Sequence, residues 1–147
     1  MIPTVTGPQV VIDTNVLVSA LRSQIGASYR LLRLLGTGRF EISLSVPLAV
    51  EYEEACKRLV GRRGGLTVED IDDILDYIYS VAHRKQIHYL WRPFLRDSDD
   101  DMVLELAVAA ACEIIVTYNK SDFKGVEQFG IRTMTSQEFL RHIRELP

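Results

Sequence analysis

Hydrophobic positions along the chain form short runs typical of strands, and these alternate with longer runs at helical spacing. The strand-like runs are rich in β-branched residues or alternate between apolar and polar positions, and they cover 9–12, 40–44, 113–117 and 131–134. Between them, apolar residues recur every three or four positions and predict helices over 17–21, 28–35, 46–59, 71–79 and 102–111, with a last one from 136. This alternation predicts βα units with right-handed crossovers, and therefore an α/β fold with a parallel sheet.

Local signals mark where several of these helices begin. Ser28 is expected to cap one helix and Ser45 the next, since their hydroxyls can accept hydrogen bonds from the first turn. Capping boxes are predicted at Thr67–Asp70 and Thr135–Glu138, and His88–Trp91 is expected to form a short edge segment. The sequence has no internal repeat and no low-complexity segment. We therefore expect residues 1–147 to form a single domain.

The composition is that of an ordinary globular protein. Hydrophobic residues make up 47% of the 147 residues, enough for a sizeable core. No apolar stretch approaches the roughly 20 residues of a membrane helix, and the N-terminus lacks the pattern of a signal peptide. Cys56 and Cys112 lie in apolar helical patterns and are expected to be buried free thiols, as in a reducing compartment. These features predict a cytoplasmic protein with no membrane attachment.

The charge distribution changes the picture given by the net charge. A formal charge of −3 does not by itself favour a nucleic-acid-binding protein. Seven of the acids are clustered, however, and basic residues outnumber the acids that remain. Basic residues gather at Lys57, Arg58, Arg62 and Arg63, and again at 83–85. These groups are either solvated helix ends and loops or a patch that contacts phosphates, and both interpretations stay open.

The clustered acids lie at four places where an α/β fold puts a ligand site. Asp13 directly follows the first strand, Glu51 lies in the helix after the second, four acids within 97–101 precede a helix, and Asp122 follows the strand at 113–117. Ligands bind at the carboxyl ends of such strands. Each acid alone has a structural alternative as a cap, a solvated residue or a complement to a helix dipole. Their joint placement instead predicts a Mg²⁺ or Mn²⁺ site, because a divalent cation offsets carboxylate repulsion and serves phosphate chemistry.

Five segments in this order resemble the motifs of PIN-domain nucleases. They are the opening segment Val11–Ala20, Glu51–Tyr52 after Ser45, Asp99–Asp101 with Leu104–Ala107, Thr117–Phe123, and the closing strand and helix at Thr133–Leu140. Together they span nearly the whole chain. The resemblance is strongest to the prokaryotic group described as toxin components of toxin–antitoxin pairs.

This resemblance implies a PIN-like domain with a four- to five-stranded parallel sheet flanked by helices on both faces. It implies a Mg²⁺- or Mn²⁺-dependent ribonuclease, an RNA substrate, a small antitoxin partner and a homodimer. Carried onto this chain, Asp13 and Asp101 would be the principal metal ligands, with Asp99 beside them. Glu51 would orient or deprotonate the attacking water, and Asp122 would hold a second ion or its waters.

Other residues would support the site. Asn15, Ser45 and Asn119 would act from behind the ligands, and Arg62 and Arg63 would contact flanking phosphates. Many relatives carry an acid where this chain has Asn119, so whether Asn119 or Asp122 completes the site is open.

Two rival interpretations remain beside a nuclease. One is a catalytically silent PIN module that binds RNA or protein. The other is a phosphotransfer domain of the receiver or haloacid-dehalogenase kind; the latter wants a second Asp where Asn15 stands. The sequence does not choose among RNA classes or between RNA and DNA.

Overall fold

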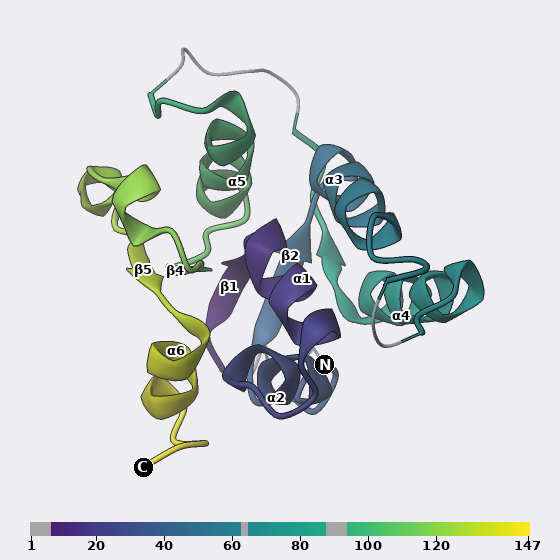
Figure 1. Cartoon of the computed structure of the whole chain (residues 1–147). Helices are drawn as coiled ribbons and strands as arrows, with labels where there is room; N and C mark the ends of the chain where they lie inside the picture. Colours follow the sequence, from purple (N-terminus) through teal and green to yellow (C-terminus); the bar gives the residue numbers. More distant parts are fainter. Residues whose placement is uncertain (1–6, 63–64, 88–93) are drawn as a thin grey trace, which may run out of the picture.

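The strands form one parallel sheet, as the sequence predicts. A computed structural model of the protein describes residues 7–62, 65–87 and 94–147 (Figure 1). Its five-stranded sheet has the order β3-β2-β1-β4-β5, and every neighbouring pair is parallel. The strands are β1 (Gln9–Ile12), β2 (Glu41–Leu44), β3 (His83–Arg84), β4 (Ile114–Val116) and β5 (Arg132–Met134). The predicted α/β fold is confirmed.

Helices cover both faces of this sheet. They are α1 (Thr14–Arg22), α2 (Ala27–Arg33), α3 (Val46–Lys57), α4 (Val68–Val81), α5 (Ser98–Ala109) and α6 (Ser136–His142), with short 3₁₀ helices η1 (Lys120–Phe123) and η2 (Val126–Phe129). Helix α5 packs on β1, β2 and β4 on one side. Helices α2 and α6 contact each other on the other side, so that in Figure 1 α5 lies above the strands and these two lie below them.

The middle of the sheet is the most buried part of the core. Val10 and Val11 of β1 pair with Ile114 and Ile115 of β4, and all four side chains are completely buried. β-Branched residues suit strands covered on both faces. The last pair in this register is Ile12 with Val116. The next residue of each strand therefore emerges at the same edge of the sheet, which positions the site described below.

Most predicted caps are present. The Ser45 hydroxyl accepts a 3.3 Å hydrogen bond from the Leu48 amide, and complete capping boxes open α4 and α6. The prediction that Ser28 caps a helix is wrong. Gly26 is the N-cap residue of α2, and Ser28 lies within the first turn, where its buried hydroxyl is 2.8 Å from that of Ser136. The helix thus begins before Ser28 and directs this side chain toward α6.

Other details differ from the prediction or lie outside the described residues. The third strand is His83–Arg84, paired with the end of β2, where the sequence indicated only a basic cluster. The edge segment predicted at 88–91 lies within residues 88–93, outside the described residues. Both cysteines are buried and free, as predicted. Within the described ranges, no helix has the length and apolar character needed to cross a membrane.

Candidate active site

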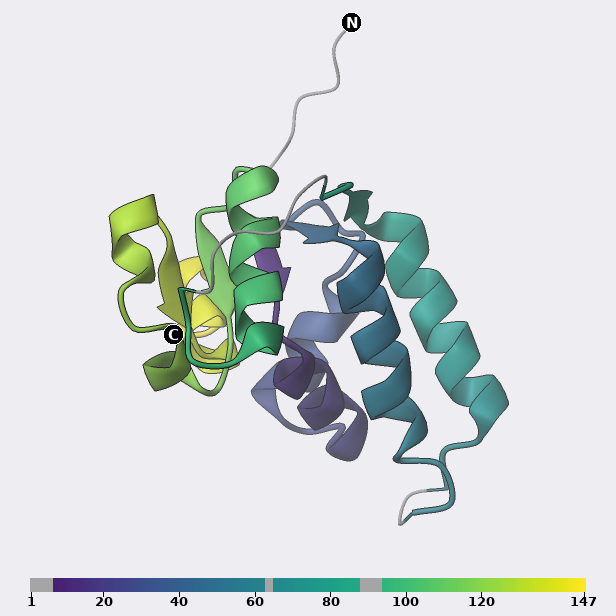
Figure 2. The ribbon, with the colours of Figure 1, turned by 90° about the horizontal axis from the view of Figure 1, so that it is seen from above.

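An open cleft of about 690 Å³ lies at the carboxyl edge of the sheet. It is bordered by α1, α3, the start of α5 and η1, which approach one another in both views of the ribbon (Figures 1 and 2). Its acidic lining residues are Asp13, Glu51, Glu54, Asp97, Asp99, Asp100 and Asp122. The volume is within the range of small-ligand sites. Acids distant in sequence are therefore brought into one cleft, as the sequence predicts.

Asp13 lies at the base of this cleft and is only 7% exposed. It is the N-cap residue of α1, and its Oδ1 accepts a 2.9 Å hydrogen bond from the Thr14 amide. Burial raises the pKa of its carboxyl above the ordinary value, and the nearby charges of Asp122 and Asp97 act in the same direction. The site thus holds one carboxylate in an environment that disfavours its charge.

Thr117 and Asn15 fix the orientation of that carboxylate. The Thr117 hydroxyl donates a 2.8 Å hydrogen bond to Oδ2 of Asp13, and the Asn15 amide donates to the same oxygen at 3.3 Å. The Asn15 side-chain oxygen in turn accepts from the amide of Tyr118. Asn15 therefore contacts Asp13 from behind, where the sequence placed it. Thr117 was missed as a site residue, although its position directly after β4 matches that of Asp13 directly after β1.

Glu51 faces the cleft from α3. Burial raises its pKa to about 7, with further contributions from the charges of Asp99 and Asp13. Its Oε2 atom is buried and has no hydrogen-bond partner among the described residues. The neighbouring Tyr52 is fully buried, and its hydroxyl donates to the backbone carbonyl of Ile12. This bond ties the helix that carries Glu51 to the strand end that carries Asp13.

The start of α5 contributes Asp97, Asp99 and Asp100. The Asp97 side chain caps the helix by accepting a 2.9 Å hydrogen bond from the Asp99 amide. Burial, followed by the charges of Asp13 and Asp97, raises the pKa of Asp100 to about 7. In the sequence Asp100 is one member of the acidic run, and no role was predicted for it. Its place three residues after the N-cap is the signal that would have separated it from its neighbours.

Asp101 lies elsewhere, so the structure does not bring it into the cleft lining with the other acids. It is buried, and its Oδ1 accepts hydrogen bonds from the backbone amides of Phe94 at 3.2 Å and Leu95 at 2.8 Å. Successive helical residues point about 100° apart, so two adjacent aspartates cannot both face the same cleft. Asp101 is placed to hold the segment before α5, and Asp100 occupies the position expected for Asp101.

Two residues after β4 line the cleft, Asn119 and Asp122. The Asn119 backbone amide donates a 3.1 Å hydrogen bond to the Thr117 hydroxyl. Asp122 lies in η1 and its charge contributes to the raised pKa of both Asp13 and Asp100. The open choice between these two residues therefore becomes a choice between a neutral amide and a carboxylate that both border the cleft.

The basic residues at the cleft differ from those predicted. Arg22 and Arg58 line it. The Arg62 side chain instead donates a hydrogen bond to the backbone carbonyl of Arg58 and is not among the lining residues. Arg63 lies outside the described residues. Arg22 follows the opening motif by only a few residues, and its position at the end of a helix that starts at Asp13 could have indicated it.

The donor set suits a hard divalent cation. Three acids of the cleft have raised pKa values because their charges are partly buried and uncompensated, and a buried oxygen of Glu51 has no partner among the described residues. Mg²⁺ and Mn²⁺ bind carboxylate oxygens and would offset these charges. No group of three or more acidic, histidine or cysteine side chains in the described part of the chain is already gathered as a ligand set. The cleft thus has the right chemistry in an open arrangement.

Comparison with known proteins identifies the family. A family model for the PIN domain matches residues 9–121. The chain belongs to the PIN domain family. This match contains Asp13, Glu51 and Asp100, and PIN domains are nucleases.

Solved structures share the fold of this PIN domain at low sequence identity. One is VapBC2 from Rickettsia felis bound to a DNA fragment from their promoter, with a TM-score of 0.59 and 16% identity over 86% of this chain and 98% of the other. Another is VapBC-1 from nontypeable Haemophilus influenzae, with a TM-score of 0.57 and 14% identity over 88% of this chain and 98% of the other. No curated protein matches the chain.

Proposed function

We propose that this PIN domain is a Mg²⁺- or Mn²⁺-dependent endoribonuclease and the toxin component of a toxin–antitoxin pair. The observation that carries the proposal is the convergence of Asp13, Glu51, Asp100 and Asp122 from four separate segments on one cleft. A cluster of acids that raise one another's pKa values destabilises the fold. Such a cost is typical of a functional site.

Asp13, Asp100 and Asp122 would hold the metal, with Asp99 at the more exposed side of the cleft. When bound there, a divalent ion lowers the pKa of water and neutralises charge that develops on the phosphate. Asp100 takes the role that the family resemblance implied for Asp101, because Asp101 is occupied by two backbone amides.

Glu51 would accept a proton from the attacking water. A general base works best with a pKa near the operating pH, and burial brings the pKa of Glu51 to about 7. Its Oε2 makes no hydrogen bond to another described residue, so the oxygen is available to a water or a ligand. Asn15 and Thr117 would keep Asp13 in one orientation. Ser45 would act at a distance by fixing the start of α3.

The biological part of the proposal is a small antitoxin partner, a homodimer and a cytoplasmic location. Its support is the family match and the two related folds, both of which come from VapBC toxin–antitoxin complexes. Identity below 20% carries the fold only, so the substrate must be tested directly.

The test is cleavage of single-stranded RNA and DNA of the same sequence by the purified protein in Mg²⁺, Mn²⁺ or EDTA. We expect cleavage of RNA with either metal and none with EDTA. Undiminished cleavage in excess chelator would contradict the metal requirement. Binding of RNA without cleavage under any condition would support the silent module instead.

A pair of isosteric variants tests the assignment within α5. Asp100→Asn removes a charge from the cleft, and we expect it to abolish cleavage. Asp101→Asn keeps the Oδ1 atom that accepts from Phe94 and Leu95, so we expect it to fold and cleave. The reverse ranking would restore Asp101 as the ligand.

A further inference from the structure

The cleft extends well beyond its carboxylates, between two helices that begin at neighbouring strands. Helices α1 and α3 follow β1 and β2, pack against each other, and lie side by side in Figure 2. Arg22 ends α1, and Arg58 is the C-cap residue of α3. At 1.5 Å per residue, Arg22 lies about 12 Å along α1 from Thr14, and Arg58 about 10 Å along α3 from Glu51. The two arginines therefore mark the end of the cleft opposite the acids.

Both guanidinium groups are available to a ligand. Neither makes an ion pair or a side-chain hydrogen bond with any residue that the structure describes. Both side chains nevertheless line the cleft. Unpaired guanidinium groups that converge on a cleft are suited to phosphate, because each presents several N–H donors in a planar fork.

An apolar wall lies between the two ends. Val18 of α1 and Pro47, Val50 and Ala55 of α3 line the same cleft, and Val50 is 48% exposed. Apolar side chains on an open wall are suited to contact with the sugar or base of a nucleotide. The sequence of surfaces along the cleft is thus acidic, apolar and basic.

We propose that Arg22 and Arg58 form a second phosphate subsite, which binds a phosphate of the same RNA strand other than the one being cut. This inference rests on the proposed nuclease function and specifies how the substrate lies in the cleft. The acids repel a polyanion, so attraction must come from elsewhere when the cleft lacks metal. A basic group at only one end gives the strand a fixed register, since bonds to phosphate position a nucleic acid without reading its sequence.

A purely structural role for the arginines makes a different prediction. Cations near a helix C-terminus interact favourably with the helix dipole, and both residues lie at such an end. That role alone would lower the melting temperature of an alanine variant and leave its RNA affinity unchanged.

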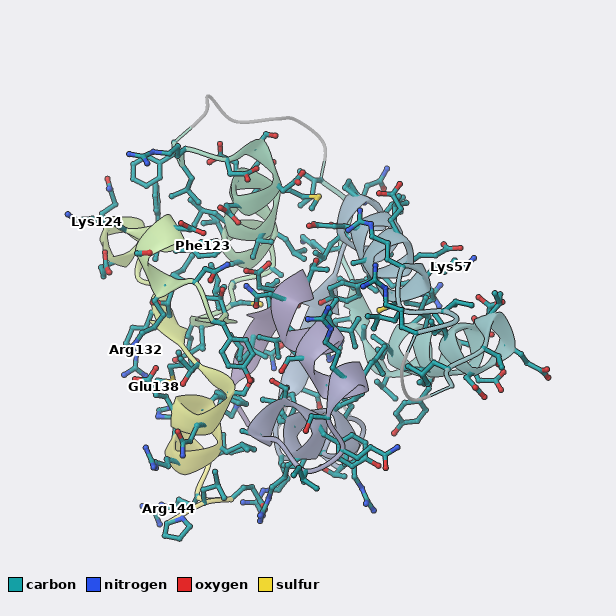
Figure 3. The ribbon with its side chains drawn as sticks, in the orientation of Figure 1. Lys57, Phe123, Lys124, Arg132, Glu138 and Arg144 are labelled. Atoms are coloured by element: carbon teal, nitrogen blue, oxygen red, sulfur yellow. The ribbon has the colours of Figure 1, made fainter. Side chains whose placement is uncertain are left out.

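The test measures binding of a fluorescent single-stranded RNA in EDTA, where cleavage is absent, at several salt concentrations. We expect Arg22→Ala with Arg58→Ala to weaken binding about tenfold or more, since a charged hydrogen bond contributes roughly 1.5–3 kcal/mol. The slope of log affinity against log salt should fall in magnitude by about 0.7 for each phosphate that the variant no longer binds. Arg132→Ala is the matched control, because Arg132 is exposed on β5, away from α1 and α3 (Figure 3).

Uncharged linkages locate the bound phosphate. RNAs that carry one methylphosphonate at successive positions should show a loss of affinity for the wild type at a linkage separate from the cut. The double variant should show no loss at that linkage. An unchanged affinity and salt slope in a folded double variant would overturn the subsite while cleavage by the wild type still supports the nuclease. Arginine-dependent binding without any metal-dependent cleavage would do the opposite.

Discussion

The hydroxyl of Thr117 donates a 2.8 Å hydrogen bond to Oδ2 of Asp13, across 104 residues of sequence. Both residues follow directly after the last pair of β1 and β4, Ile12 with Val116. Thr117 is completely buried, so this bond is shielded from water. The orientation of Asp13 therefore depends on β4 as well as on its own helix cap.

Thr117→Val should lower both stability and activity. The variant keeps the shape of the side chain but leaves Oδ2 of Asp13 without its shortest hydrogen bond, and a buried group without its partner costs about 1–3 kcal/mol. Urea unfolding at pH 7 measures the loss of stability, and metal-dependent RNA cleavage measures the loss of rate. Thr117→Ser retains the hydroxyl and is the control. Equal behaviour of the valine variant and the wild type would show that the bond is dispensable.

Glu51→Gln should lower the cleavage rate and leave RNA affinity nearly unchanged. The amide preserves the size of the side chain but cannot accept a proton, and general bases contribute roughly 10²–10⁴-fold in rate. Single-turnover cleavage in Mn²⁺ and RNA binding in EDTA separate the two effects. Glu54→Gln, on the same helix and also at the cleft, is a matched control. Full activity of the Glu51 variant would make it an ordinary helix residue.

Stability without divalent metal should fall as the pH rises from about 4 to about 7. The folded pKa values of Glu51 and Asp100, both about 7, exceed the ordinary values of 4.5 and 3.8. In this window the native state binds more protons than the unfolded chain, so the free energy of unfolding decreases with pH. Asp100→Asn should therefore raise the melting temperature at pH 8 and change it little at pH 4.

The control for this pH effect is Asp73→Asn, which removes an exposed charge on α4 away from the cleft. Thermal unfolding in EDTA across the pH range gives the comparison. A melting temperature of Asp100→Asn below that of the wild type at pH 8 would show that the Asp100 charge is already compensated.

Mn²⁺ should raise the melting temperature of the wild type and have much less effect on Asp13→Asn. A ligand bound only by the native state stabilises it by about 2.7 kcal/mol at a concentration 100 times its Kd. Asp13 lies at the base of the cleft and is the acid held most firmly by hydrogen bonds. Equal shifts in both proteins would place the metal elsewhere.

Asp122→Asn should raise the Mn²⁺ concentration needed for half-maximal cleavage more than Asn119→Ala does. Both residues border the cleft, but only Asp122 adds negative charge near Asp13 and Asp100. Metal-titrated cleavage by the two variants side by side measures the difference. If Asn119→Ala has the larger effect, the amide takes the fourth place and Asp122 is a solvated residue.

The sequence predicted the parts of the fold that depend on local patterns. The strands at Gln9–Ile12 and Ile114–Val116 and the capping boxes of α4 and α6 follow from apolar runs and from hydroxyl–carboxyl spacing. The strand His83–Arg84 could not be found in this way, since two exposed polar residues carry no strand pattern. Its pairing depends on the exposed edge of β2.

Within the site, the sequence placed the acids in the right segments but could not choose between neighbours. The choice between Asp100 and Asp101 depends on a shift of one residue, and the exact start of α5 decides it. The hydrogen bond of Thr117 to Asp13 depends on the register of two strands that are far apart in the sequence. Arg22 and Arg58 meet because α1 and α3 pack together, which is a property of the tertiary structure alone.

A chain of three hydroxyl groups joins the site to the end of the protein. Ser28 of α2 bonds to Tyr118 and to Ser136, which lies in α6, while the Tyr118 amide donates to Asn15 beside Asp13. The PIN family match ends at residue 121, so it does not include α6. A truncated protein without α6 would retain every carboxylate of the cleft and yet lose the support of Tyr118. The minimal catalytic unit of this chain is therefore longer than the segment that defines its family.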